Sequence, residues 1–335
     1  MPVRIGIDGG GTSTRSLIYD DEEGILAEAG GPACALSGGL ERALQSIGQT
    51  LEQALTKAAE HGRPVPARPG AIDAVCLGIS GAASLPAGQP LSEGVSRFLG
   101  ERGYPVSPER ILVVSDIEIA LAGALGGAPG VVLIVGTGAV AYGRSPGNRT
   151  FRADGWGWLL GDAGSGYDIG RAALRAAFAI QDGRREDKTS SGLVAAVTAH
   201  FQVSALSQLV PMVYEGRIKV SDIAALSPVV AELAAAGDPV CLAILDEAAE
   251  ALAQSVLAVV SRLYSGEGEG ERPTGPIPVS YQGGVIRHSP VLRELVVRKI
   301  EAKGERLGVR CRVKPPAYEP VVGALLLAGA SPEKL

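Results

Sequence analysis

Apolar residues follow two patterns along the chain. Short continuous apolar runs end at glycine, serine or aspartate, whereas longer stretches carry an apolar residue every three or four positions. The short runs predict buried strands, and the wider spacing predicts helices with one buried face. The predicted strands cover residues 3–7, 15–19, 25–29, 72–79, 110–114, 278–281 and 309–313. The predicted helices cover residues 40–60, 239–264 and 290–304, and a last helix begins at 320.

Residues 3–29 and 131–155 follow the same order of elements. In each segment an apolar strand meets a glycine-rich turn, and a second strand, a polar turn and a third strand follow. This similarity indicates an internal repeat and two related α/β domains, and a cleft between domains is where ligands are expected. After Gly166 the chain is predicted to be mostly helical. Residues 266–276, GEGEGERPTGP, are predicted to form a flexible surface loop.

Length, charge and cysteine content narrow the classes of protein. The 335 residues are too many for one ordinary core and are typical of two domains. The net charge is −5 without a basic cluster, so we expect no nucleic-acid partner. Four scattered cysteines without a CxxC pair argue against a zinc site or a disulfide scaffold and favour the reducing cytoplasm. We expect no membrane partner, because the chain begins without a signal pattern and no apolar run reaches ~18 residues.

The glycine-rich turn in residues 6–19, GIDGGGTSTRSLIY, is the first candidate for chemistry. Its spacing fits neither a dinucleotide fingerprint, which needs GxGxxG and a helix, nor a P-loop, which needs a lysine. What remains is a hairpin tip that offers glycine N–H groups and the hydroxyls of Thr12, Ser13 and Thr14 beside Asp8. N–H groups and hydroxyls suit phosphate oxygens, and a carboxylate at a strand end suits Mg²⁺. A glycine-rich hairpin without a ligand is the alternative.

Two further glycine turns come after predicted strands. The Gly-Thr-Gly turn at residues 136–138 holds the place of the first glycine turn in the second repeat, which favours a second contact with the same phosphates. Gln-Gly-Gly at residues 282–284 ends a strand, where two glycines would let a flat ring such as adenine lie against the backbone. For each turn taken alone, ordinary turn formation is the competing interpretation.

Carboxylates and tryptophans mark two more candidate sites. Asp116 follows a buried strand and precedes an apolar helix, so it is either a helix N-cap or a general base. Residues 154–166, DGWGWLLGDAGSG, contain both tryptophans of the chain and lead into a helix. Aromatic faces beside carboxylates suit a sugar, and a helix N-terminus suits an anion. Alternatively, Trp156 and Trp158 are core anchors.

In this order, the motifs resemble those of the actin, Hsp70 and sugar-kinase superfamily, and within it the N-acetylglucosamine kinase and BadF-type ATPase family. The similarity covers nearly the whole chain and rests on IDGGGTSTR, VVLIVGTGAVAYG, VSYQGGVIRHSP, EPVVGALLLA and DGWGWLLGDAGSG. It implies an α/β fold of two duplicated ribonuclease-H-like (actin-like ATPase) domains with an inter-domain cleft. The N-terminal domain would be residues 1–126, completed by a C-terminal helix in 319–335, and the C-terminal domain would be residues 127–318 with a helical insertion.

The same resemblance implies an ATP-dependent sugar kinase that uses ATP and Mg²⁺ and phosphorylates an amino sugar, with the 6-hydroxyl as the expected acceptor. Asp8 would hold Mg²⁺ through water, and Asp116 would be the catalytic base. The residues implied around the phosphates and adenosine are Gly10, Gly11, Thr12, Thr14, Thr137, Gly138, Gly283 and Gly284. The residues implied on the sugar side are Cys34, Ser80, Gly81, Asp116, Trp156, Gly157 and Asp162.

Two positions depart from the family pattern, both on the sugar side. Cys34 stands where family members often carry asparagine, and Ala163 stands where the motif commonly has glutamate. The acceptor therefore stays open among N-acetylglucosamine, glucosamine, an N-acetylmuramic-type sugar and a plain hexose. A BadF-type ATPase or activase and a non-catalytic sugar-binding regulator are the alternative functions. A homodimer is expected only because it is the commonest oligomer.

Overall fold

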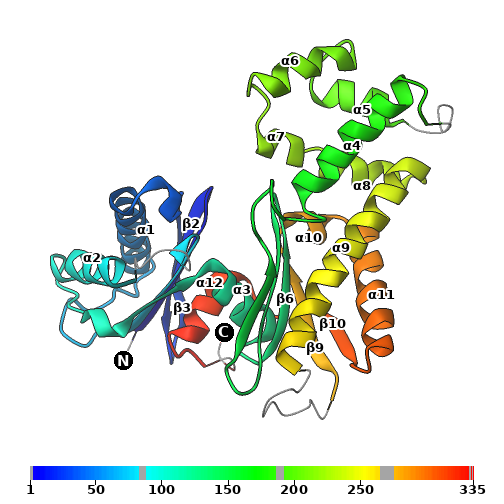
Figure 1. The fold of residues 1–335 in the computed structure, drawn as a ribbon. Helices are drawn as coiled ribbons and strands as arrows, with labels where there is room; N and C mark the ends of the chain where they lie inside the picture. Colours follow the sequence, from blue (N-terminus) through cyan, green and yellow to red (C-terminus); the bar gives the residue numbers. More distant parts are fainter. Residues whose placement is uncertain (1–2, 83–87, 186–191, 265–274, 332, 334) are drawn as a thin grey trace. The chain divides into compact units, whose positions relative to one another are not determined.

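The computed structural model describes residues 3–82, 88–185, 192–264, 275–331, 333 and 335. The chain divides into two compact units, Met1–Ala128 with Pro316–Leu335, and Pro129–Pro315. We call them unit 1 and unit 2 and describe each by itself. Each unit is built on a five-stranded sheet with helices packed against it (Figure 1).

Unit 1 contains a sheet in the strand order β3-β2-β1-β4-β5. The first three strands of the chain pair antiparallel, and β4 and β5 extend the sheet in parallel from β1. Each strand overlaps a predicted one, and β4 has the predicted bounds. The strands are β1 (Val3–Gly9), β2 (Ser13–Asp20), β3 (Gly24–Pro32), β4 (Ile72–Ile79) and β5 (Ile111–Ser115).

Two pairs of helices cover the two faces of the unit 1 sheet (Figure 1). They are α1 (Leu40–Glu60) with α2 (Gly88–Gly100), and α3 (Asp116–Leu125) with α12 (Pro320–Leu327). Helices on both faces explain why β4 is apolar almost throughout. α1 begins and ends where its apolar spacing predicts, whereas α2 is absent from the prediction. α3 and α12 cross closely at Gly123 and Gly323, because a Cβ at Gly323 would overlap the Ile119 carbonyl.

Unit 2 repeats this sheet in the order β8-β7-β6-β9-β10. Again three strands that are consecutive in sequence pair antiparallel, and two later strands add in parallel. The strands are β6 (Gly130–Val135), β7 (Ala139–Arg144), β8 (Thr150–Asp154), β9 (Ile277–Gln282) and β10 (Cys311–Lys314). The equal strand order confirms the predicted fold of two duplicated ribonuclease-H-like (actin-like ATPase) domains.

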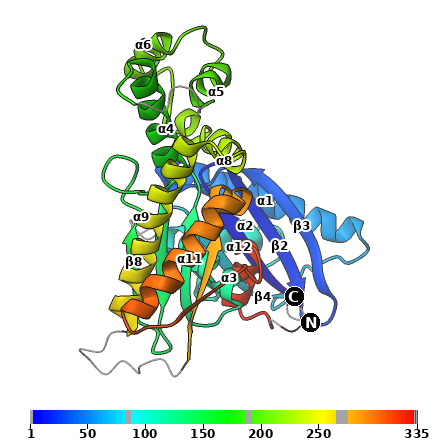
Figure 2. The same cartoon turned by 90° about the vertical axis from the view of Figure 1, so that its right-hand side faces the viewer.

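Unit 2 has two long helices packed on its sheet, α9 (Pro239–Tyr264) and α11 (Pro290–Arg306), which lie side by side (Figure 2). α9 has the predicted bounds, and the Asp238 carboxylate accepts hydrogen bonds from the N–H groups of Val240 and Cys241, as an N-cap does. α11 runs two residues past its predicted end at Gly304. The other helices are α4 (Gly166–Gln181), α5 (Leu193–His200), α6 (Leu209–Tyr214), α7 (Val220–Ala224), α8 (Ser227–Ala235) and α10 (Gly284–His288).

Two further observations concern the sequence-based expectations. Most of the predicted surface loop at 266–276 lies outside the described residues. Within the described residues, no single helix is both long and apolar enough to cross a membrane. One pair of helices, Val220–Ala235 with Pro239–Tyr264, meets the length and composition criteria together, although it is bent by 119°.

Candidate functional site

The turn between β1 and β2 exposes its backbone. The N–H of Gly10 donates to the Ser13 carbonyl at 3.0 Å, which closes the turn. Gly11 and Thr12 are exposed, and a Cβ at Gly11 would meet no atom within 4 Å. The N–H groups of Gly11 and Thr12 have no hydrogen-bond acceptor among the described residues. This tip therefore offers the donors that a phosphate would need.

Thr14 lies apart from the exposed tip. Its side chain is fully buried in β2, and its hydroxyl donates to the Pro32 carbonyl at 2.5 Å. The sequence-based prediction placed this hydroxyl against a phosphate, but its proton is already used within the sheet. Thr12 and Ser13 are the hydroxyl residues that the turn exposes.

Asp8 lies near the end of β1 and pairs in register with Arg15 on β2. Burial and then the charge of Asp116 raise the pKa of Asp8 to about 6, whereas Arg15 acts in the opposite direction. Arg15 gives only partial compensation, since it also pairs with Glu28 at 2.6 Å and Glu319 at 2.5 Å. A carboxylate with an elevated pKa near a second carboxylate fits a bound cation.

The donor set around Asp8 fits Mg²⁺ better than a metal held by protein ligands alone. Among the residues that the structure describes, no three His, Cys, Asp or Glu side chains gather closely enough to enclose a metal. Mg²⁺ is commonly bound through one or two carboxylates, with water and substrate phosphates completing its coordination. Asp8 beside the open β1–β2 turn provides that combination.

Asp116 is the first residue of α3, and it is not the N-cap. Ser115 caps the helix and forms a capping box with Glu118, which leaves the Asp116 carboxylate available. That carboxylate accepts hydrogen bonds from the Ile117 N–H at 3.0 Å and from the Ser80 hydroxyl. Burial raises the pKa of Asp116, and these hydrogen bonds oppose the rise. The N-cap alternative is thus excluded, and a partly buried carboxylate remains for proton transfer.

Ser80 connects Asp116 to the β1–β2 turn. Its N–H donates to the Gly9 carbonyl at 2.8 Å, and its own carbonyl accepts from the N–H of Leu36 at 3.0 Å. Gly81 comes next with a φ of +88°, a conformation that favours glycine. Unit 1 therefore brings Asp8, the open turn, Ser80 and Asp116 into one connected group.

Cys34, predicted to contact the sugar, is only 1% exposed. Its N–H donates to the Gly10 carbonyl at 3.2 Å, and its Sγ occupies the space that a Cβ at Gly9 would need. Burial raises the pKa of its thiol. The structure places Cys34 as a buried support for the end of β1, without a surface on which a sugar could lie.

The Gly-Thr-Gly turn between β6 and β7 is held by the N-terminus of α4. The carbonyls of Gly136 and Thr137 accept hydrogen bonds from the N–H groups of Gly166 at 2.8 Å and Tyr167 at 3.2 Å. The predicted anion site at this helix N-terminus is thus filled by the turn itself. The N–H groups of Thr137 and Gly138 have no acceptor among the described residues, so the turn offers the donors instead.

We call residues 154–163 the aromatic turn. Trp156 is 63% exposed and Trp158 47%, and Leu159 and Leu160 are exposed as well. The Trp158 ring meets Tyr167 edge-on, with ring centroids 5.5 Å apart. These exposures exclude the alternative in which the two tryptophans are core anchors. Exposed aromatic faces are typical of surfaces that stack against a ligand.

Asp162 joins the aromatic turn to the Gly-Thr-Gly turn. Its carboxylate accepts from the Ala139 N–H at 3.3 Å, and a Cβ at Gly138 would lie 2.8 Å from its Oδ2. Burial raises the pKa of Asp162, backbone hydrogen bonds lower it, and the charge of Asp154 raises it further. The sequence-based reasoning missed Asp154, whose carboxylate accepts hydrogen bonds from three N–H groups of the aromatic turn. The available signal was an Asp-Gly pair, which is typical of turns.

Gly283 and Gly284 differ in their surroundings. Gly283 has a φ of +97°, and a Cβ there would overlap the Val135 carbonyl, so its glycine is required by the neighbouring strand β6. Gly284 begins α10, and a Cβ there would meet nothing within 4 Å. The open backbone that an adenine ring would need is therefore at Gly284.

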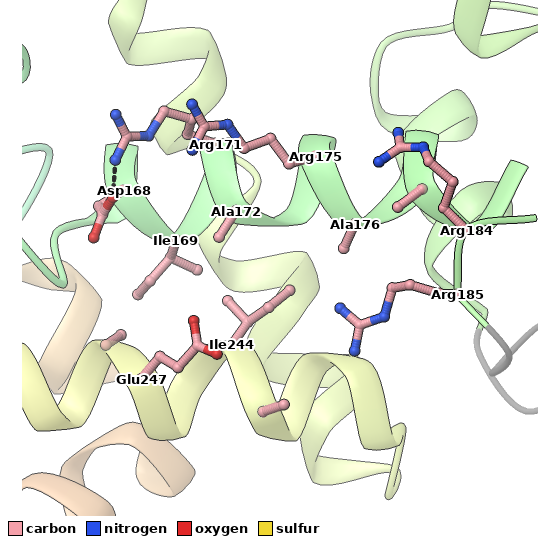
Figure 3. Close-up of a pocket in the computed structure, with 13 residues that line it drawn as sticks. Asp168, Ile169, Arg171, Ala172, Arg175, Ala176, Arg184, Arg185, Ile244 and Glu247 are labelled. Carbon is pink, nitrogen blue, oxygen red and sulfur yellow. Dashed lines mark hydrogen bonds and ion pairs between the residues drawn. The ribbon is translucent and has the colours of Figure 1, made fainter. Parts of the chain in front are cut away.

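A cavity of about 480 Å³ lies between α4 and α9, and none of the predicted site residues lines it (Figure 3). Its lining includes four arginines together with Asp168 and Glu247. Arg171 bonds to Asp168 at 2.6 Å, and Arg184 bonds to Asp182 at 2.7 Å. The guanidinium charges are thus partly neutralised by the protein's own carboxylates.

The chain is similar to several known proteins. The chain is 34% identical over 264 residues to an N-acetylmuramic acid/N-acetylglucosamine kinase of Clostridium acetobutylicum, covering 78% of this chain and 81% of that one. It is 31% identical to an N-acetyl-D-glucosamine kinase of Dictyostelium discoideum, covering 97% of both. A solved structure described as a putative N-acetylglucosamine kinase from Chromobacterium violaceum is 29% identical, with a TM-score of 0.68 and 98% and 99% coverage. Residues 5–328 match one family along their whole length, and the chain belongs to it: the BadF/BadG/BcrA/BcrD ATPase family.

Proposed function

We propose that the protein is an ATP-dependent sugar kinase that transfers the γ-phosphate of MgATP to an amino sugar such as N-acetylglucosamine or glucosamine, at the 6-hydroxyl. The observation that supports this proposal most is the environment of the Asp116 carboxylate. That carboxylate does not cap the helix and accepts a hydrogen bond from the Ser80 hydroxyl. The backbone N–H of Ser80 in turn donates to the Gly9 carbonyl at the end of β1. A pure nucleotide- or sugar-binding protein needs no such base.

The phosphate chemistry is assigned to backbone donors and Asp8. In this proposal the N–H groups of Gly11 and Thr12 in unit 1, and of Thr137 and Gly138 in unit 2, donate to phosphate oxygens. Asp8 would hold Mg²⁺ through water, and the bound ion would neutralise charge on the phosphates. Asp116 accepts the proton of the sugar hydroxyl as its oxygen attacks the γ-phosphorus and ADP leaves. Positioning and charge stabilisation supply most of the catalysis in such transfers.

The acceptor contacts are assigned to the aromatic turn. Trp156 and Trp158 would present faces to the apolar side of a sugar ring, and the Asp162 carboxylate would accept hydrogen bonds from its hydroxyls. Ser80 and Gly81 complete the proposed set in unit 1. An N-acetylmuramic-type acceptor belongs to the same chemical class, as the name of the Clostridium relative suggests.

The test is a screen of MgATP-dependent ADP formation over hexoses, amino sugars and N-acylated amino sugars, with the phosphorylated oxygen assigned by NMR. We expect ADP release to rise sharply with one amino sugar and the product to carry phosphate on O6. Equal ADP release with and without every sugar would contradict the kinase and favour an ATPase. Sugar binding by calorimetry without MgATP affinity would favour a binding protein.

The second candidate function is an activase, an ATPase that acts on a redox partner, because the family is named for ATPases. Such proteins use clustered cysteines to hold an iron–sulfur centre shared with a partner. Here Cys34, Cys76, Cys241 and Cys311 are all buried in the described structure, and burial raises the pKa of each thiol. A cluster ligand must be deprotonated and accessible, so these cysteines favour the kinase.

A further inference from the structure

We propose that Asp154 is a positioning residue for acceptor recognition: its carboxylate holds the aromatic turn in the shape that presents Asp162, Trp156 and Trp158. This inference rests on the proposed kinase function, but its structural part can be tested without it. Asp154 is the last residue of β8 and has a φ of +63°, a left-handed conformation that aspartate, asparagine and glycine adopt more readily than other residues.

A single carboxylate ties together both ends of the turn. Oδ1 of Asp154 accepts from the N–H of Gly155 at 2.8 Å and of Asp162 at 2.6 Å. Oδ2 accepts from the N–H of Ala163 at 3.0 Å. Gly161 passes so close that a Cβ there would overlap Oδ1. The start and the end of a long excursion of the chain therefore meet at one side chain.

Three other contacts reach the turn: the Arg152 guanidinium lies 4.3 Å from the centre of the Trp156 ring, the Trp158 ring meets Tyr167 edge-on, and the Asp162 carboxylate accepts from the Ala139 N–H. The four large apolar side chains of the turn, at positions 156 and 158–160, are exposed and so contribute little core packing. Within the turn, the carbonyl of Gly157 accepts from the N–H groups of Leu160 at 3.2 Å and Gly161 at 2.8 Å, which closes only the tip. Hydrogen bonds to a charged group are stronger than neutral ones. Asp154 differs from the other contacts because its three charge-assisted hydrogen bonds join the two ends of the turn.

The position of Asp162 is set by the same contacts. Its backbone N–H is bonded to Asp154, and its carboxylate lies against Gly138 and Ala139. The carbonyls of Gly136 and Thr137, in contrast, are held by the N-terminus of α4, and Asp154 makes no hydrogen bond to either residue in the described part of the chain. Loss of the Asp154 carboxylate should therefore change the acceptor contacts and leave the proposed phosphate donors in place.

Asp154→Asn and Asp154→Gly are the informative variants, because asparagine and glycine both tolerate a positive φ. Asparagine keeps one acceptor oxygen but brings an NH₂ donor into the donor-rich pocket, and glycine removes both oxygens. Asn148→Gly is the matched control, since Asn148 is exposed in another turn of unit 2 with a φ of +59°. We expect kcat/KM for the sugar to fall roughly 10–100-fold in Asp154→Gly and less in Asp154→Asn. KM for MgATP should stay within about twofold.

A second readout does not need catalysis. Both tryptophans of the chain lie in the aromatic turn, so tryptophan emission and acrylamide quenching report its conformation directly. We expect both to change in the two Asp154 variants and not in the Asn148→Gly control. The proposal would be overturned if both folded Asp154 variants kept the tryptophan emission, the quenching and the sugar kcat/KM of the wild type. An equal loss of sugar and MgATP affinity would also overturn it, because that result marks a general structural defect.

The two proposals can fail separately. If the wild-type protein phosphorylates no sugar, the kinase proposal fails, and the tryptophan measurements still decide whether Asp154 holds the turn. If the wild type is a kinase and the variants keep its sugar kinetics, only the role of Asp154 fails. Should Asp154→Gly not fold, as judged by its melting temperature, Asp154→Asn carries both measurements.

Discussion

The turn between β1 and β2 and the turn between β6 and β7 connect equivalent strands of two sheets with the same order, but their neighbours differ. The first turn is held at its base, where Ser80 and Cys34 bond to the carbonyls of Gly9 and Gly10, and its tip is open. The second turn directs its carbonyls into the N-terminus of α4, and its last glycine lies against Asp162.

The difference arises from the segment after the third strand of each repeat. After β3 the chain passes through Cys34 into α1, and the carboxylates near the first turn come from β1 and α3. After β8 the chain forms the aromatic turn and enters α4 directly, so the second turn is built together with the proposed acceptor contacts. In the proposed function, the duplicated topology would provide two sets of phosphate donors, α3 would carry the base in unit 1, and the segment between β8 and α4 would carry the sugar contacts in unit 2.

The largest effect is expected from removing the proposed base in unit 1. Asp116→Asn keeps the shape of the side chain but loses proton acceptance, so turnover with the best sugar should fall about 10²–10⁴-fold. The dissociation constant of MgATP, measured by calorimetry, should stay nearly unchanged. Asp73→Asn is the control, because Asp73 is a carboxylate at the opposite end of β4 paired with Arg110. Near-normal turnover in Asp116→Asn would break the assignment of the base to unit 1.

The second effect concerns Asp8, the carboxylate before the first turn. In the unfolded chain this group ionises with its ordinary pKa of 3.8, and in the folded protein its pKa is about 6. Between these values the folded state binds a proton that the unfolded state lacks, so this group's contribution to stability falls as pH rises and is lost above pH 6. The loss is at most about 3 kcal/mol.

Asp8→Asn should therefore be more stable than wild type at about pH 7 and equal to it below about pH 4. Urea unfolding of both proteins at the two pH values measures this, and Asp73→Asn gives the baseline for removing a half-buried carboxylate that is paired with an arginine. If the difference in unfolding free energy between Asp8→Asn and wild type did not vary with pH, the pKa of Asp8 would not be raised in the folded protein. The same variant should weaken binding of MgATP at neutral pH.

The elements of this fold were accessible from the sequence because their signals are local. The bounds of α1 are given by apolar residues at spacing three and four, and the repeat of strand, glycine turn and strand is visible without alignment. The equal strand order of the two sheets then results from repeating the same unit. The helix at 88–100 was not predicted: its buried residues Leu91, Val95 and Leu99 have helical spacing, but Gly-Gln-Pro at its start and Gly94 in its middle are typical of turns.

The site was less accessible because its contacts are non-local. A glycine required by a ligand cannot be distinguished in sequence from one required by the protein, and Gly283 proves to be needed by the Val135 carbonyl. The burial of the Thr14 side chain depends on the register of β2 with β3, and the burial of Cys34 depends on its packing against Gly9. Asp154 bonds to N–H groups as many as nine residues further along, and nothing in the sequence indicates that spacing.

The two turns can be compared directly by adding one methyl group to each. Gly11→Ala meets no neighbour, whereas Gly138→Ala would place its Cβ 2.8 Å from the Asp162 carboxylate. Neither glycine has a positive φ, so alanine is not strained at either position. We expect Gly11→Ala to keep the wild-type melting temperature. Gly138→Ala should lose about 1–3 kcal/mol of stability and should also raise KM for the sugar.

Enzyme kinetics of Gly11→Ala and Gly138→Ala test the same comparison of the two turns. Any activity lost in Gly11→Ala reports close approach of a ligand to the first turn, since the protein itself leaves that space open. In Gly138→Ala, a raised sugar KM with unchanged MgATP binding would trace the defect to the contact between the new methyl group and the Asp162 carboxylate. Equal melting temperatures for both alanine variants would break the contrast between an open turn and a packed one.

The smallest effect is expected at Cys34, where sequence and structure disagree. Because its side chain is 1% exposed and its thiol pKa is raised by burial, Cys34 in the folded protein should react slowly with iodoacetamide. Cys34→Ala removes one buried sulfur and should cost about 1 kcal/mol of stability. KM for the sugar should change less than about threefold, because the acceptor contacts are assigned to the aromatic turn. A tenfold rise in that KM, with MgATP binding intact, would instead place a sugar contact after β3 in unit 1 and weaken the division of roles between the two repeats.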